Sequence, residues 1–89
     1  MAKVVVTHGV ADVAKWLEFK AERAEAIGSL GGRNVVDHVA DDGSKVVAVT
    51  ADMDDPAAFM ATLASPPAEL GEVMQRHGVQ PPLTAYVEG

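Results

Sequence analysis

The hydrophobic pattern of the first half of the chain recurs in the second half. Each copy begins with an alternating, β-branched run of the kind that forms strands. An aspartate follows each run, and an aromatic residue stands four positions after the aspartate. The two copies are offset by 43 residues: 4–7, Asp12 and Trp16 in the first, and 46–50, Asp55 and Phe59 in the second. A strand and a capped helix used twice, with a further strand after each helix, predict an α+β fold with the ferredoxin-like order β-α-β-β-α-β and a four-stranded antiparallel sheet.

Capping and turn residues set the element boundaries. Asp12 is suited to begin a helix, because an aspartate side chain accepts a hydrogen bond from the first helical turn. Apolar positions continue from there at helical spacing to Ile27, and glycines at 28, 31 and 32 end the helix. The Asp-Gly pair within the turn 41–44 predicts a hairpin. The predicted strands are 3–8, 34–40, 45–51 and 83–87.

The second helical region carries the same type of start signal twice. Asp55-Pro56 places a capping residue before a proline, which is favoured at the first position of a helix. Ser65-Pro66 repeats this arrangement, so the second helix is predicted to break there, into 56–64 and 66–77, with Ser65 as the cap of the later segment. An apolar stripe then leads to His77, and Gly78 ends the helix.

The first and third strands are apolar on both faces. A sheet with one face in water alternates apolar and polar residues instead. Hydrophobic residues make up 48% of the 89 residues, more than so short a chain buries easily on its own. These observations favour a homodimer, with helices on one face of each sheet and the partner's sheet on the other. A monomer with imperfect alternation is the alternative. Residues 1–89 are expected to form one domain.

Composition excludes several functions. A net charge of −6 argues against nucleic acid and anionic membranes as partners. Because cysteine is absent, disulfides, zinc-thiolate sites and thiol nucleophiles are excluded. Phosphate-binding glycine loops, zinc-protease motifs and serine-hydrolase elbows are not found either. The acidic turns lack the spacing of a calcium loop, so no metal is expected. No segment approaches the ~20 apolar residues of a membrane span, so a cytoplasmic location is expected.

Short motifs throughout the chain resemble small members of the dimeric α/β-barrel superfamily, which is loosely similar to antibiotic biosynthesis monooxygenases and polyketide cyclase-like proteins. The resemblance implies a homodimer with a cavity between sheet and helices, and chemistry that needs no cofactor. It rests on the stretches His8-Gly9-Val10-Ala11-Asp12 with Trp16, Asp41-Asp42, Ala58-Phe59, Ala64-Ser65-Pro66, 74–79 and Pro81-Pro82. The superfamily's oxygenases surround their substrate with Asn, Trp and Tyr or His, whereas the one asparagine here, Asn34, begins the second predicted strand. Haem degradation is therefore disfavoured.

Few side chains are candidates for chemistry. His8 and His38 lie on predicted strands, and a histidine is suited to remove a proton from an enol or phenol near neutral pH. Trp16 and Arg23, on one side of the first helix, could bind a planar acidic ligand or could be core residues. Tyr86 could donate a hydrogen bond into a cavity or cover a dimer seam. His8 is the candidate catalytic base, and the candidate ligand-binding residues are His38, Tyr86, Trp16 and Arg23. His77, on the apolar stripe, is expected to be structural.

Two classes of function stay open at this level. The first is an enzyme that removes a proton from a small, mostly apolar organic ligand, such as a cofactor-independent monooxygenase or a cyclase-like enzyme. The second is a non-catalytic dimeric module that binds such a ligand. A catalytic pocket usually needs several converging polar groups, and the shortage of candidates favours the second class.

Overall fold

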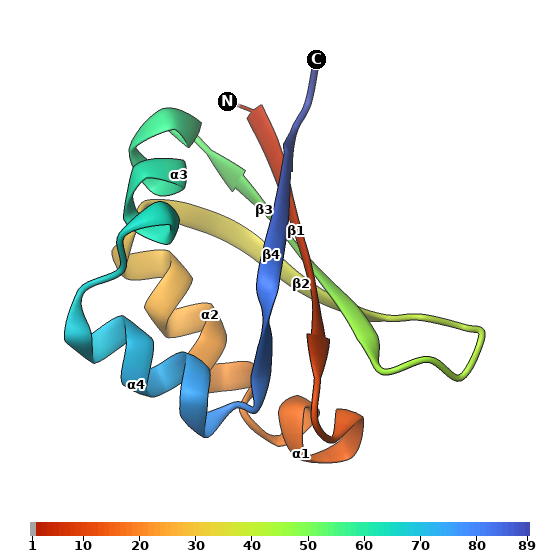
Figure 1. Ribbon diagram of the computed structural model, residues 1–89. Helices are drawn as coiled ribbons and strands as arrows, with labels where there is room; N and C mark the ends of the chain where they lie inside the picture. The colour runs from red at the N-terminus through yellow and green to blue at the C-terminus, as the bar shows by residue number, and fades with distance from the viewer. Residues whose placement is uncertain (1) are drawn as a thin grey trace.

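A computed structural model describes residues 2–89, which form one antiparallel sheet covered on one face by helices (Figure 1). The elements in chain order are β1 (Ala2–Val10), α1 (Val13–Glu18), α2 (Lys20–Ser29), β2 (Gly32–Val39), β3 (Val46–Met53), α3 (Pro56–Ala64), α4 (Ala68–Arg76) and β4 (Val79–Val87). The sheet order is β2-β3-β1-β4, and each neighbouring pair is antiparallel. This is the predicted ferredoxin-like fold. Each strand extends beyond at least one of its predicted limits, most of all β4, which begins four residues earlier than predicted, while β2 ends and β3 begins one residue short of its prediction.

Two of the predicted helix caps are confirmed. The side chain of Asp12 accepts a hydrogen bond from the backbone N–H of Lys15 at the start of α1. Asp55 accepts one from Ala58 at the start of α3, and Pro56 occupies the first turn. The first helical region differs from its prediction, because a turn at Phe19 divides it into α1 and α2.

The predicted break in the second helical region is confirmed, but the predicted cap is wrong. Ser65 ends α3, and its backbone N–H donates to the carbonyl of Ala61. Helix α4 begins only at Ala68, after Pro67, with no side-chain cap. The two consecutive prolines explain the shift: each removes an N–H donor, and Pro67 disfavours helical backbone at the residue before it. Ser65 is therefore too far from the first free N–H groups of α4 to cap them.

Alternation along β1 and β3 directs one set of side chains towards the helices. Val4, Val6, His8 and Val10 on β1 are buried, and so are Val47, Val49, Ala51 and Met53 on β3. Phe59 of α3 and Trp16 of α1 complete two neighbouring apolar clusters. The repeated aromatic position of the sequence therefore places one ring in each cluster.

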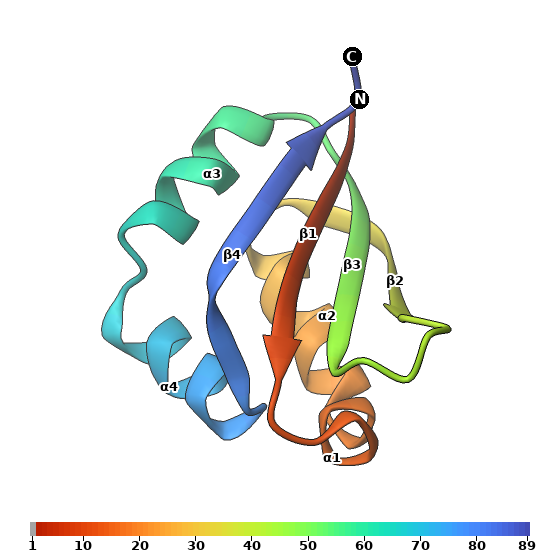
Figure 2. The same ribbon diagram turned by 45° about the vertical axis from the view of Figure 1, so that its right-hand side comes forward.

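The opposite face of the sheet carries no helix within residues 2–89 (Figure 2). Apolar side chains on this face reach solvent, including Val36, 48% exposed, and Tyr86, 57% exposed. Val5, at the centre of the sheet, lies opposite Tyr86 in the β1–β4 ladder. An uncovered sheet face with this much apolar surface is typical of an interaction surface. Within the same residues, no helix is long and apolar enough to cross a membrane.

Asp55 and Ser65 give a direct test of helix capping. Asp55→Ala removes a side chain that bonds the first turn of α3, so it should lower the free energy of unfolding by about 1 kcal/mol. Ser65→Ala removes no such bond and should change it by less than about 0.5 kcal/mol. Urea denaturation of both variants checks this, and a larger loss for Ser65→Ala would contradict the observed start of α4.

Candidate functional site

A cavity of about 80 Å³ lies between the sheet and the helices α2, α3 and α4. Its wall is mostly apolar. Helix α4 contributes Leu70, Val73 and Met74, yet no residue of α4 is fully buried. The helix therefore stands off the sheet, and its apolar stripe borders the cavity. Three polar side chains also line the cavity: His8, Arg23 and His77.

His8 projects from β1 into this cavity, and its hydrogen bond to the backbone fixes the tautomer of its ring. Its Nδ1 lies 2.8 Å from the backbone carbonyl of Gly9 and must donate its hydrogen to that oxygen. The other nitrogen, Nε2, then carries a lone pair and has no hydrogen-bond partner among residues 2–89. Burial lowers the pKa of His8; the bond to Gly9 opposes this shift, and the charge of Arg23 adds to it. His8 is thus a neutral imidazole, with its basic nitrogen free, at neutral pH.

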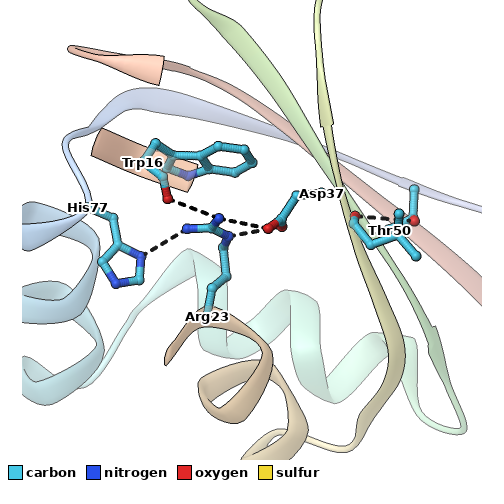
Figure 3. A network of polar contacts seen from close by, with 6 residues as sticks. Trp16, Arg23, Asp37, Thr50 and His77 are labelled. Atoms are coloured by element: carbon cyan, nitrogen blue, oxygen red, sulfur yellow. Dashed lines mark hydrogen bonds and ion pairs between the residues drawn. The ribbon is translucent and has the colours of Figure 1, made fainter. Parts of the chain in front are cut away.

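Arg23 is the centre of a buried polar network (Figure 3). Its side chain rises from α2 and forms a two-pronged ion pair with Asp37 of β2, at 3.0 Å and 2.8 Å. The same guanidinium donates to the backbone carbonyl of Trp16 and lies 3.7 Å from the centre of the Trp16 ring. Arg23 is 6% exposed. Its charge is therefore balanced within the core and held in one position.

His77 joins the C-terminal end of α4 to this network. Its Nδ1 accepts from Arg23 at 3.3 Å, and its Nε2 donates to Glu22 at 3.1 Å, which is the pattern of a neutral imidazole. The ring of Phe19 stacks on it, with centroids 4.6 Å apart. Burial lowers the pKa of His77, and the bond to Glu22 opposes this shift. Arg76 also pairs with Glu22, so the end of α4 is fixed to α2 by adjacent contacts.

Trp16 connects His8 with Arg23. Its ring meets the His8 ring edge to face, with centroids 6.2 Å apart, while its face lies against the guanidinium. The indole is fully buried, and its Nε1 has no hydrogen-bond partner among the described residues. A buried N–H without a partner costs about 1–3 kcal/mol, which is unusual in a site selected for packing alone.

The structure brings together three of the five predicted site residues and separates the other two. His8, Trp16 and Arg23 lie on the helical side of the sheet, within one set of contacts. His38 and Tyr86, the other two candidate ligand-binding residues, do not line this cavity. His38 contacts Thr50, and Tyr86 is paired with Val5, both on the uncovered face of the sheet. Side-chain alternation is the reason: His38 and its buried neighbour Asp37 must point to opposite faces.

Three members of the polar network were not among the predicted site residues: Asp37, Glu22 and His77. The pairing of Asp37 with Arg23 was not foreseen. Glu22 was not a candidate residue, and His77 was expected to be structural, which agrees with its contacts between α4 and α2. His77 bonds to Arg23, 54 residues away in the sequence, and to Glu22, 55 residues away. Only the tertiary fold brings these three residues together. For Asp37 and His77 the available signal was a polar residue within an otherwise apolar pattern, whereas Glu22 carried no such signal. No group of three metal-binding side chains occurs in residues 2–89.

Comparisons with solved structures identify the same architecture in other proteins. No family model and no curated protein matches the sequence. An antibiotic biosynthesis monooxygenase is 14% identical with a TM-score of 0.64; the match covers 100% of this chain and 97% of that one. A Streptomyces coelicolor monooxygenase in complex with nanaomycin D is 22% identical with a TM-score of 0.62, covering 98% and 84%. A dimeric ferredoxin-like protein from an uncultured marine organism is 7% identical with a TM-score of 0.61, covering 100% and 93%. The predicted resemblance is confirmed at the level of the fold.

Two ion pairs of similar length test the importance of the buried network. Asp37→Ala leaves the buried charge of Arg23 without a counter-ion and should lower the free energy of unfolding by about 3–5 kcal/mol. Asp54→Ala breaks the exposed pair between Arg33 and Asp54 and should cost at most about 1 kcal/mol. Denaturant unfolding of both variants checks this, and equal losses would contradict a central role for the Arg23–Asp37 pair.

Proposed function

We propose that this protein binds a small, mostly apolar organic molecule in the cavity between its sheet and helices, and that His8 removes a proton from the bound molecule. The reaction belongs to the class of cofactor-independent monooxygenation or cyclisation. The free Nε2 of His8 is the observation that carries this proposal, since a general base needs an unprotonated nitrogen that faces the substrate. The shared fold with monooxygenases supports the reaction class.

Arg23 is suited to bind the oxygen of such a molecule. Its bonds to Asp37, the Trp16 carbonyl and His77 occupy four of the five N–H groups of a guanidinium. One N–H on the nitrogen nearest His77 is left, on a side chain that lines the cavity. When His8 removes a proton from an enol or phenol, negative charge develops on oxygen. A fixed N–H of a cation stabilises that charge in an apolar site.

A non-catalytic binding module is the second candidate, and one observation favours it. Most hydrogen-bonding groups at this site are already satisfied by other protein groups, which leaves the Nε2 of His8, one N–H of Arg23 and the buried N–H of Trp16. A catalytic pocket usually offers more converging polar groups. Binding of a ligand without any turnover would identify this second function.

We further propose that the protein acts as a homodimer through the uncovered face of its sheet. The apolar side chains on that face support this, as does the dimeric state of the marine ferredoxin-like protein. His38 and Tyr86 then lie at or near the dimer seam, which is one of the two roles that the sequence left open for Tyr86. The cavity stays within each subunit, because the helices and the partner occupy opposite faces.

Replacement of His8 tests the proposed base. His8→Val should leave the free energy of unfolding unchanged or higher, since valine fills the site without a buried polar group. The same variant should lose binding or turnover of para-substituted phenols and 1,3-diketones. Turnover by the unmodified protein should fall as the pH drops through the pKa of His8, because protonation removes the lone pair. The burial that lowers this pKa places the midpoint below ~6.5, the usual value for histidine.

His38→Val is the matched control, because it makes the same replacement on the opposite face of the sheet. It should leave binding by each folded subunit intact. Thermal melts of both variants separate loss of the fold from loss of the site. The proposal fails if His8→Val destabilises the protein and binds phenols as before, or if His38→Val abolishes binding while the protein stays folded.

The homodimer makes a separate prediction. Small-angle scattering at micromolar concentration should give the mass of two chains, with an interface of about 1,500 Å² or more in total. Val5→Lys places a charge at the centre of the uncovered face and should give the mass of one chain. A single-chain mass for the unmodified protein would contradict the dimer and leave the proposal for the cavity intact.

A further inference from the structure

A second hollow continues the cavity to the surface. This groove, of about 270 Å³, lies between the C-terminal half of α2 and the N-terminal half of α4. Four residues line both the cavity and the groove: Ala26, Leu30, Leu70 and Val73. The apolar wall therefore passes without interruption between the two helices. Together the two hollows reach the lower end of the ~300–1,000 Å³ that ligand pockets usually have, whereas the cavity alone does not.

The path between the helices is polar at its inner end and apolar along its length. Glu22 and Arg23 of α2 contact His77 of α4 at one end, and the groove beside Ser29 and Pro67 marks the other end. The helices are thus antiparallel, and Arg23 faces the same end of the path as His77. Seven residues separate Arg23 from Leu30, which corresponds to about 10 Å along a helix. Only apolar side chains line both hollows between these ends.

We propose that the ligand is an unbranched amphiphile, with a small oxygenated head beside His8 and Arg23 and an apolar chain that leaves between α2 and α4. This inference rests on the proposed function, because the head occupies the same cavity. The inner cavity, at about 80 Å³, is too small for a fused polycyclic ring system. A path of ~10 Å along the helices gives room for an extended alkyl chain of several carbons. The chain ends at the exposed rim near Ser29 and Glu69.

Ala26 determines whether a chain can pass. It lines both hollows, and its methyl group is the smallest side chain among the four shared residues. A bulky residue at this position narrows the passage between the cavity and the groove. Ser29 lies on the groove alone, one turn further along α2, so a bulky residue there shortens the path at its outer end. The two positions thus limit chain length at different points.

The test uses para-alkylphenols from 4-methylphenol to 4-heptylphenol, all below their micelle-forming concentrations. Trp16 is the only tryptophan and borders both His8 and Arg23, so its fluorescence reports binding. Affinity should rise about fourfold for each added methylene, which is the fold-change equivalent to ~0.8 kcal/mol per buried CH₂. Ala26→Phe should lose this gain in affinity from the shortest chains on. Ser29→Trp should lose the gain in affinity only for the longest chains.

Ala21→Phe is the matched control, because Ala21 is an exposed residue of the same helix and lines neither hollow. It should keep the full rise in affinity with each added methylene. Melts of all variants identify any that fail to fold, and Ser29→Trp, at an exposed position, provides the test if Ala26→Phe does not fold. The proposed path for the apolar chain is overturned if affinity stays the same from 4-methylphenol to 4-heptylphenol. It is also overturned if the rise in affinity persists in both Ser29→Trp and a folded Ala26→Phe. Binding of the whole series that His8→Val does not weaken overturns the proposed function instead. If no member of the series binds, both are overturned.

Discussion

The ion pair between Arg23 and Asp37 is the interaction on which the candidate site depends. It joins the first long helix to an edge strand of the sheet, and it is almost entirely removed from water, with side chains 8% and 2% exposed. Removing two charges from water is costly, and a buried pair offsets that cost only when its geometry and its further hydrogen bonds are good. Here the bonds to the Trp16 carbonyl and to His77 meet this requirement. The same bonds determine where α1 and α4 lie, so the network sets the positions of the cavity walls.

Much of the fold could be predicted from the sequence, because its signals are local. Asp12 and Asp55 act within one helical turn, and the alternation along β1 and β3 marks both as strands. The helix start predicted at Ser65 was wrong because a cap followed by one proline differs from a cap followed by two. The division of the first helix at Phe19 has no proline or glycine to signal it. That turn accompanies the stacking of Phe19 on His77, a contact between residues 58 positions apart in the chain, which local patterns cannot reveal.

The candidate site was less predictable for a related reason. When a strand is apolar on both faces, alternation shows which residues share a face, but not which face the helices cover. His8 and His38 could therefore both be placed inside a cavity. The register of the sheet decides between them: His8 pairs with the buried Val47, and His38 pairs with Ala48, the next residue along β3. A shift of one position along a strand thus separates a candidate base from a residue of the uncovered face.

The attachment of α4 explains how the cavity can persist in so small a protein. An empty apolar hollow of about 80 Å³ costs on the order of 2 kcal/mol, so a core free to relax would tend to close it. The C-terminal end of α4 is fixed by the contacts of His77 and Arg76 with α2, and its N-terminal end follows the rigid Pro66-Pro67 pair. With its two ends held apart from the sheet, the helix cannot settle onto β1 and β3. Its apolar stripe therefore stays available to a ligand. A ligand that fills the cavity would bury this apolar surface and stabilise the folded protein.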